Sequence, residues 1–198
     1  MSNMFGSSSV KSLDLSNFDT SNVTNMGSMF QSCQASSIDL SSFDTSKVTN
    51  FSSMFHSCYA TSLDLSNFDT SSATSMTRLF QGCSNLTSLN VSNLDTSNMT
   101  SMAYMFYTCG QLKSLDLTSF DTSNVTDMGS MFYGCRLLTF LDLRSFDFTK
   151  VKTYTNMFAN MLSNCEIIVK DETAKAWLTS KFSTFTNIKT VAEYEATE

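Results

Sequence analysis

Cysteine is the first residue type in this chain that could carry chemistry, and it recurs at regular spacing. One cysteine appears every 25 or 26 residues at Cys33, Cys58, Cys83, Cys109 and Cys135, and Cys165 follows. Zinc sites need closely paired ligands such as Cys-x-x-Cys, and the sequence contains no such pair. A thiol that occupies one position of every repeat is most simply a small core residue. We therefore expect buried thiols in place of disulfides or a metal site.

Other catalytic patterns are missing from the sequence. His56 is the single histidine, and no Ser, Cys or Asp constellation accompanies it. Serine and aspartate are abundant, but they recur identically along the chain and do not converge on one place. No G-x-S-x-G, H-E-x-x-H or glycine-rich phosphate loop occurs, and only six glycines are present. The sequence predicts a protein that is not an enzyme and that uses no cofactor or metal.

The composition excludes several classes of partner. Charged residues make up 15% of the 198 residues, and the net charge is −6. A nucleic-acid binder would need clustered Lys and Arg to neutralise phosphates. No basic amphipathic stretch suits an acidic membrane surface, and no run of 18 apolar residues could span a bilayer. We expect no nucleic-acid partner and no direct membrane insertion.

A repeated stretch accounts for most of the chain. "LDLSNFDTSNVTNMGSMF" (13–30) returns as "LDLSNFDTSS" from 63, "LDLTSFDTSNVTDMGSMF" from 115 and "LDLRSFDFTKV" from 141. Met-Phe, or Leu-Phe in its place, recurs with a period of 25 residues and later 26. A fixed period in the twenties indicates a solenoid whose stacked coils share one core. We expect a solenoid of about six to seven coils over residues 1–169.

Each repeat combines two periodicities. The stretch "LKSLDLTSF" (112–120) has the L-x-x-L-x-L spacing of a leucine-rich repeat, and its L-x-L centre alternates like a short strand. Val23, Met26, Phe30 and Cys33 follow at offsets of 0, 3, 7 and 10, which is one stripe of an α-helix. The sequence predicts an α/β leucine-rich-repeat solenoid, with short parallel strands on the concave face and helices of two to three turns on the convex face.

One aspartate lies at the corner between the predicted strand and the predicted helix. A short carboxylate there can accept hydrogen bonds from the first helical turn, so we expect a structural helix cap. Threonines on the same corners are expected to bond the backbone locally. The predicted caps are Asp19, Asp44, Asp69, Asp95, Asp121 and Asp147.

A second column of polar residues lies between the buried positions of the L-x-L strands. Its members are Asp14, Asp39, Asp64, Asn90, Asp116 and Asp142. These side chains would form a binding face for hydroxyl- or cation-bearing ligands, or they would merely keep an exposed sheet soluble. Both interpretations stay open. A specific contact is expected where the pattern changes, at Asn90, at Phe140, which replaces a serine, and at Arg144.

The C-terminal segment departs from the repeat. Residues 170–198 are richer in charge and hold the only tryptophan, and Asp171 and Glu172 suit a helix start. We expect a helix at about 171–182 that caps the solenoid after a strand at 166–169. The N-terminal edge shows no equivalent cover, which predicts additional repeats or self-association there.

The combined motifs "MFYGCRLLTFLDLRSFD" and "FDTSNVTDM" resemble the BspA-like leucine-rich-repeat surface proteins of bacteria over residues 1–165. This resemblance implies a right-handed solenoid displayed at the cell surface or outside the cell. It also implies adhesion to host proteins or other cells, and no catalysis. We expect a recognition or adhesion module that binds a protein or glycan through the concave sheet. The alternative is a structural repeat or receptor-binding segment of a larger fibre, such as a phage tail protein.

Overall fold

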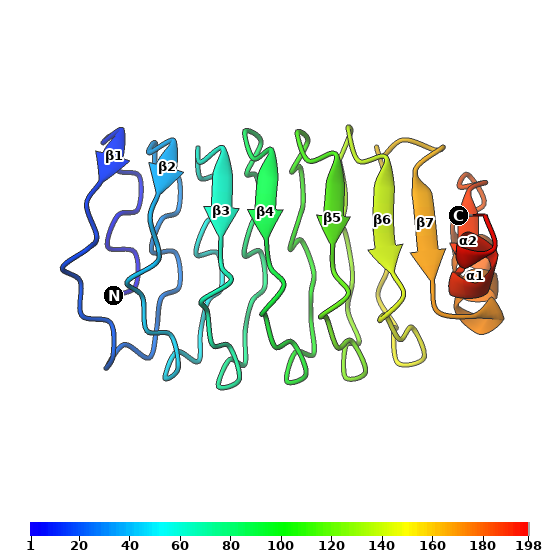
Figure 1. Ribbon diagram of the computed structural model, residues 1–198, viewed down its shortest axis with the longest axis horizontal. Helices are drawn as coiled ribbons and strands as arrows, with labels where there is room; N and C mark the ends of the chain where they lie inside the picture. The colour runs from blue at the N-terminus through cyan, green and yellow to red at the C-terminus, as the bar shows by residue number, and fades with distance from the viewer. Residues whose placement is uncertain (198) are drawn as a thin grey trace.

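The computed structural model describes residues 1–197 and has the architecture of a β-solenoid (Figure 1). Each of the first six coils contributes one short strand, and consecutive strands lie side by side along the solenoid. Pairing is parallel, for example Ser12 with Ser37 and Ser62 with Ser88. The strands of these coils are β1 (Ser12–Leu13), β2 (Ser37–Ile38), β3 (Ser62–Asp64), β4 (Ser88–Asn90), β5 (Ser114–Asp116) and β6 (Phe140–Leu143).

The strands form where the sequence alternates. In β5, Leu115 and the following Leu117 are buried, whereas Asp116 between them is exposed. The strands stay short because the second residue after each outward Asp or Asn begins a turn. This part of the prediction, parallel strands with one buried face, is confirmed by the pairing.

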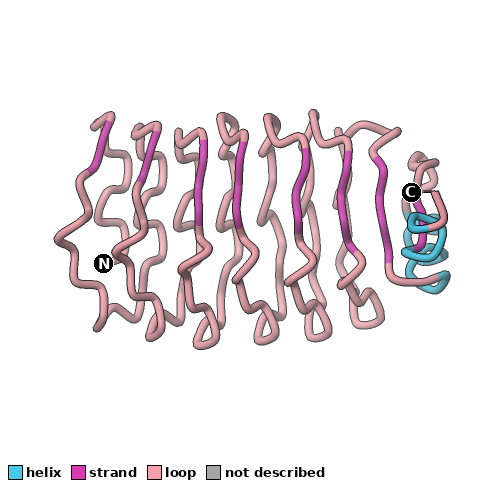
Figure 2. The backbone as a smooth tube through the Cα atoms, in the orientation of Figure 1, coloured by secondary structure: helices cyan, strands magenta, loops and turns pink. Residues whose placement is uncertain are grey.

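The helices predicted in each repeat are wrong. Residues 26–33 form consecutive turns, and Figure 2 shows loops opposite the strands in every coil. The amide of Met29 donates to the carbonyl of Met26, but the amide of Phe30 donates across to Met54 of the next coil at 2.8 Å. Ser28 and Ser32 have positive φ values of 57° and 55°, which no α-helix contains. Alternate amides therefore join neighbouring coils, where a helix would bond within itself.

The stripe that suggested a helix is nevertheless an inward-facing one. Met26, Phe30 and Cys33 are buried, and Val23 packs partly buried against the core. The Phe30 ring stacks on Phe55 at 5.6 Å, and this column continues through the solenoid. All six cysteines are free and buried, as expected of core thiols.

Buried threonines join the corners of successive coils. The Thr20 hydroxyl donates to the carbonyl of Asp44 at 2.9 Å and accepts from the amide of Asp44 at 2.8 Å. The expected role, bonding to the backbone, is correct, but the bonds run between coils. The same pairing recurs at Thr45 with Asp69, Thr70 with Asp95, Thr96 with Asp121, and Thr122 with Asp147.

The C-terminal segment continues the sheet and adds two helices. Strand β7 (Glu166–Val169) pairs with β6, and β8 (Ile188–Thr190) pairs with β7. The predicted helix is present as α1 (Glu172–Lys181), with the Asp171 side chain accepting from the Ala174 amide. Helix α2 (Val191–Glu195) follows β8. Strand β8 and α2 were not expected in the tail, and Glu198 of the predicted 170–198 segment lies outside the described residues.

Candidate functional site

The polar column is largely where the sequence places it. Five of its members are exposed on the strand side of the first five coils: Asp14, Asp39, Asp64, Asn90 and Asp116. Their pairing partners are in register, as Asp64 with Asn90 shows. The strands that carry these residues follow one another along the solenoid (Figure 1), so the five residues form one strip across the strands.

Each carboxylate of this strip also builds a turn. Asp14 Oδ1 accepts from the amide of Ser16 at 3.1 Å and from its hydroxyl at 2.7 Å. Asp116 and Thr118 repeat the arrangement at 3.0 and 2.7 Å. These hydrogen bonds lower the pKa of both carboxyl groups. The strip is consequently ionised at neutral pH, and Asn90 is its one neutral interruption.

Asp142 differs from the other members because it is only 6% exposed. The sequence predicts a solvent-facing residue here. That prediction is wrong, because the C-terminal segment packs over this part of the sheet. Helix α2 packs beside β7 and β8. The ring centroids of Tyr194 in α2 and Phe140 lie 5.9 Å apart. Ile168, the β7 partner of Asp142 in the sheet, is buried as well. The outer face of the sheet is thus partly covered from β6 onward and open before it.

The buried carboxylate is paired with arginine. Arg144 Nε lies 3.0 and 2.8 Å from the two Asp142 oxygens, and Nη2 lies 2.7 Å from Oδ2. The Arg144 side chain is 36% exposed, so Asp142 fixes the position of the guanidinium while part of the side chain faces solvent. Such a fork is oriented before any ligand arrives.

An open hollow of about 380 Å³ forms at this boundary, over β5 and β6. It is lined by Ser114, Leu115, Asp116, Thr118, Phe140, Asp142 and Arg144. The structure therefore brings together four of the predicted site residues, Asp116, Phe140, Asp142 and Arg144. The remaining members, Asp14, Asp39, Asp64 and Asn90, lie farther along the strip and outside this hollow.

The predicted helix caps have a different role, because no helix follows them. Asp19 Oδ1 accepts from the Ser21 amide at 3.0 Å and from its hydroxyl at 2.6 Å, which closes a tight turn at the corner. Asp44, Asp69, Asp95, Asp121 and Asp147 accept from the residue two positions later in the same way.

A cluster of aromatic residues on the turn segments was missed by the sequence reasoning. The Tyr107 and Tyr133 rings stack at 4.7 Å, Tyr104 lies beside Tyr107, and the Arg78 guanidinium lies 5.1 Å from the Tyr104 ring centre. Arg78 and Tyr104 have positive φ values of 62° and 61° at a position where other coils have Ser or Asn. The replacement of small residues by bulky ones at this position was the sequence signal that could have indicated the cluster.

Comparison with known proteins places this chain in a family. A family model described as "Mycoplasma protein of unknown function, DUF285" matches residues 1–90 and 57–170. No curated protein and no solved structure matches the chain. Within residues 1–197, no helix is long and apolar enough to cross a membrane. The match and the repeat solenoid agree with a BspA-like repeat family, and the chain belongs to the DUF285 family.

Proposed function

We propose that this protein is a non-catalytic recognition or adhesion module that binds a protein or glycan of a host or cell surface through its strand face. The observation that carries this proposal is the hollow over β5 and β6. Here the uniform strip ends, an aromatic ring replaces a serine, and a fixed guanidinium lies beside an exposed carboxylate.

The residues of the hollow offer complementary chemistry for such a ligand. Phe140 supplies a partly exposed ring that can pack against an apolar group or a sugar ring. Arg144 supplies donors that Asp142 already orients, and Asp116 supplies acceptor oxygens. Ordering these groups beforehand reduces the entropy that binding must overcome.

Binding of the purified chain to an immobilised panel of matrix proteins and glycans tests this proposal. Phe140→Ala and Arg144→Gln should weaken any captured interaction at least about tenfold. Asp64→Asn is the matched control, because it lies on the same strip outside the hollow and keeps a side-chain oxygen for the turn. If both site variants bound as well as the parent, the binding site would lie outside this hollow.

We also propose that the protein is displayed at the cell surface or outside the cell. We propose further that its coils form a right-handed leucine-rich-repeat solenoid with the strands on the concave face. The resemblance to BspA-like proteins supports these features. We also propose that α1 caps the solenoid. Its Trp177 stacks on Phe148 at 4.7 Å, and Phe182 packs edge-on against Phe158 at 4.9 Å, which supports a covering role.

A structural role in a larger fibre is the second candidate, and the N-terminal edge favours it. In the second coil, the carbonyls of Gly27, Met29 and Gln31 accept from amides of the first coil. The equivalent carbonyls, of Ser2, Met4 and Gly6, lie on the open edge, and the Met4 side chain is 50% exposed. These carbonyls could accept hydrogen bonds from the amides of another coil of this repeat.

If two copies of the chain met through their N-terminal edges, the carbonyls of one edge would face the carbonyls of the other, and no hydrogen bonds could form between them. This candidate therefore predicts stacking with further coils of the repeat, and no head-to-head dimer. Sedimentation velocity over a range of concentrations should show a monomer. A dimer that Met4→Ser dissolves would contradict the donor–acceptor argument.

A further inference from the structure

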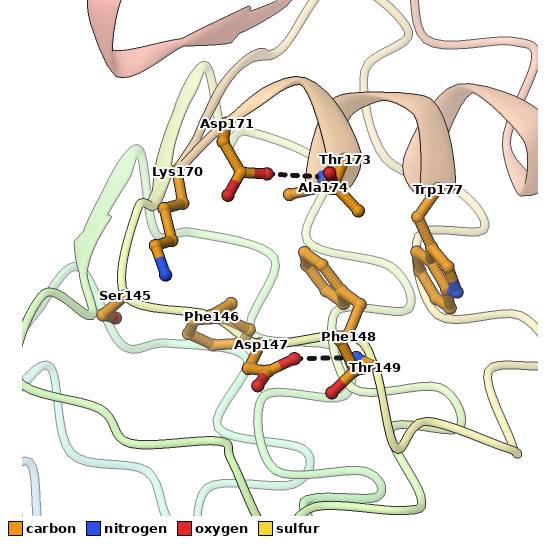
Figure 3. Close-up of a pocket in the computed structure, with 10 residues that line it drawn as sticks. All are labelled: Ser145, Phe146, Asp147, Phe148, Thr149, Lys170, Asp171, Thr173, Ala174 and Trp177. Atoms are coloured by element: carbon orange, nitrogen blue, oxygen red, sulfur yellow. Dashed lines mark hydrogen bonds between the residues drawn. The ribbon is translucent and has the colours of Figure 1, made fainter.

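A second cavity, separate from the strand-face hollow, lies where the repeats end (Figure 3). It has a volume of about 240 Å³ and opens between the corner of the last coil, residues 145–149, and the start of α1. From the α1 side, Lys170, Asp171, Ala174 and Trp177 line it. The cavity therefore joins the final repeat to the C-terminal segment.

A departure from the repeat explains the cavity. In five earlier coils, a threonine follows the corner aspartate and bonds the corner of the next coil, as Thr122 does with Asp147. In the last coil, Phe148 occupies the threonine position and stacks on Trp177 with an interplanar angle of 9°. No further corner of this type packs here within residues 1–197. The start of α1 takes its place and leaves room beside the rings.

Charges of both signs surround this room. Figure 3 shows the Lys170 side chain reaching into the space between Asp171 and Phe146, with Asp147 below. Among the described residues, no ion pair joins Lys170 to either aspartate. Asp147 Oδ1 accepts from the Thr149 amide, and Asp171 Oδ1 accepts from Ala174, so each carboxylate keeps a second oxygen for a ligand. The Thr149 bonds, with a smaller effect of Lys170, lower the pKa of Asp147 and keep it charged.

We propose that this cavity binds a free α-amino acid with an apolar side chain. The ammonium group would lie against Asp147, the carboxylate against Lys170, and the side chain against the partly exposed Trp177 ring. A simple amine would meet the Lys170 charge without compensation, and a simple carboxylate would meet two like charges. A zwitterion satisfies both signs at once, and the cavity volume admits one small molecule.

Fluorescence of Trp177, the only tryptophan, reports on this cavity directly because its ring lines the wall. Titration with L-leucine, L-methionine and L-valine should change the emission saturably for at least one of them. L-leucinamide, which lacks the carboxylate, and 4-methylpentanoate, which lacks the amine, should bind at least about tenfold more weakly than leucine.

Matched variants then locate the site. Lys170→Gln and Asp147→Asn should each weaken amino-acid binding at least about tenfold, since each removes one charge. Asp121→Asn is the control, because Asp121 holds the same corner position one coil earlier and lies outside the cavity. Thermal melts followed by circular dichroism would check that all three variants are folded.

Three results would overturn the proposal. The first is no response to any of the three amino acids up to about 10 mM, which is weaker than ordinary specific binding. The second is leucinamide or 4-methylpentanoate binding as well as leucine. The third is Asp121→Asn losing affinity as much as Asp147→Asn. None of these outcomes bears on the strand-face hollow, whose variants Phe140→Ala and Arg144→Gln lie elsewhere.

Discussion

The Thr96 hydroxyl forms a two-way bridge to the main chain of Asp121 in the next coil. The O–H group donates to the Asp121 carbonyl oxygen, and its oxygen accepts from the Asp121 amide, both at 2.9 Å. Thr96 is 1% exposed, so water does not compete for these groups. A side chain thus supplies, at a corner where no strand runs, the contacts that a β-ladder supplies elsewhere.

Replacing Thr96 with valine should destabilise the solenoid without changing side-chain shape. The change removes both hydrogen bonds and leaves the partly buried amide and carbonyl of Asp121 without their partner, which costs about 2 kcal/mol. Urea denaturation followed by circular dichroism measures the difference. Thr96→Ser retains the hydroxyl and should recover most of the loss. A valine variant as stable as the parent would show that the bridge contributes nothing net.

Asp121 itself should tolerate asparagine better than alanine. Its Oδ1 accepts from the Ser123 amide at 2.8 Å, and asparagine keeps that oxygen, as Asn90 does with Ser92. Alanine removes the acceptor and should lower the free energy of unfolding by about 1 kcal/mol. Thermal melts of both variants test this, and the helical circular dichroism signal should stay constant. A loss of helical signal would point back to a helix cap.

The repeat length and the buried positions could be predicted from the sequence, because stacked coils require the same inward residues in each repeat. The backbone between them could not. Offsets of 0, 3, 7 and 10 from Val23 to Cys33 indicate a common inward side, and a helix was the simplest way to produce it. Left-handed φ values at Ser28 and Ser32 produce the same stripe from turns, and serine carries little signal for that conformation.

The candidate site was partly predictable for a similar reason. Strand alternation places Asp116 outward, and the departures at Phe140 and Arg144 mark the end of the uniform strip. Burial of Asp142 depends on α2, which lies about fifty residues later in the chain and packs against β7 and β8. The amino-acid cavity likewise lies between Asp147 and Lys170, on elements whose contact no local pattern reveals.

Acid should unfold this protein through its turn aspartates. Hydrogen bonds from the residue two positions later lower the pKa of many of them in the folded state, including Asp44 and Asp69. A lowered folded pKa means that stability is present above the unfolded pKa, near 4, and is lost as pH falls through the folded value. Repulsion between neighbouring carboxylates is the smaller effect at both residues.

Melting temperatures should therefore be level between about pH 5 and 7 and should fall below about pH 4. The double variant Asp44→Asn with Asp69→Asn keeps the turn acceptors but removes two titrating groups, so its acid-induced fall should be shallower. Stability that rises on acidification would show that repulsion dominates.

Thiol reagents should react slowly with the folded protein. Burial raises the pKa of Cys58 and Cys165 to about 11 and that of Cys135 to about 12. The thiolate is the reactive form, so at pH 8 these thiols are both protonated and covered. A disulfide reagent such as DTNB should titrate six thiols in denaturant and react far more slowly before unfolding. Rapid labelling of the native chain at pH 8 would contradict this packing.

The Phe148–Trp177 stack should decide how firmly the C-terminal segment is attached. Phe148 is buried, and its ring also lies 6.1 Å from Phe146 of the last coil. Phe148→Ala should lower the free energy of unfolding by about 3 kcal/mol and shift Trp177 emission to the red as its ring gains water.

The sharper variant is Phe148→Thr, which restores the residue that the five earlier coils carry at this position. In those coils the threonine is stabilising because the next corner offers both an amide and a carbonyl, as Asp121 does for Thr96. Beside α1 that partner is missing among the described residues, so Phe148→Thr should destabilise about as much as Phe148→Ala. Calorimetry with Trp177 fluorescence would measure both. If Phe148→Thr matched the parent in stability and emission, the ring stack would not hold α1 against the last coil.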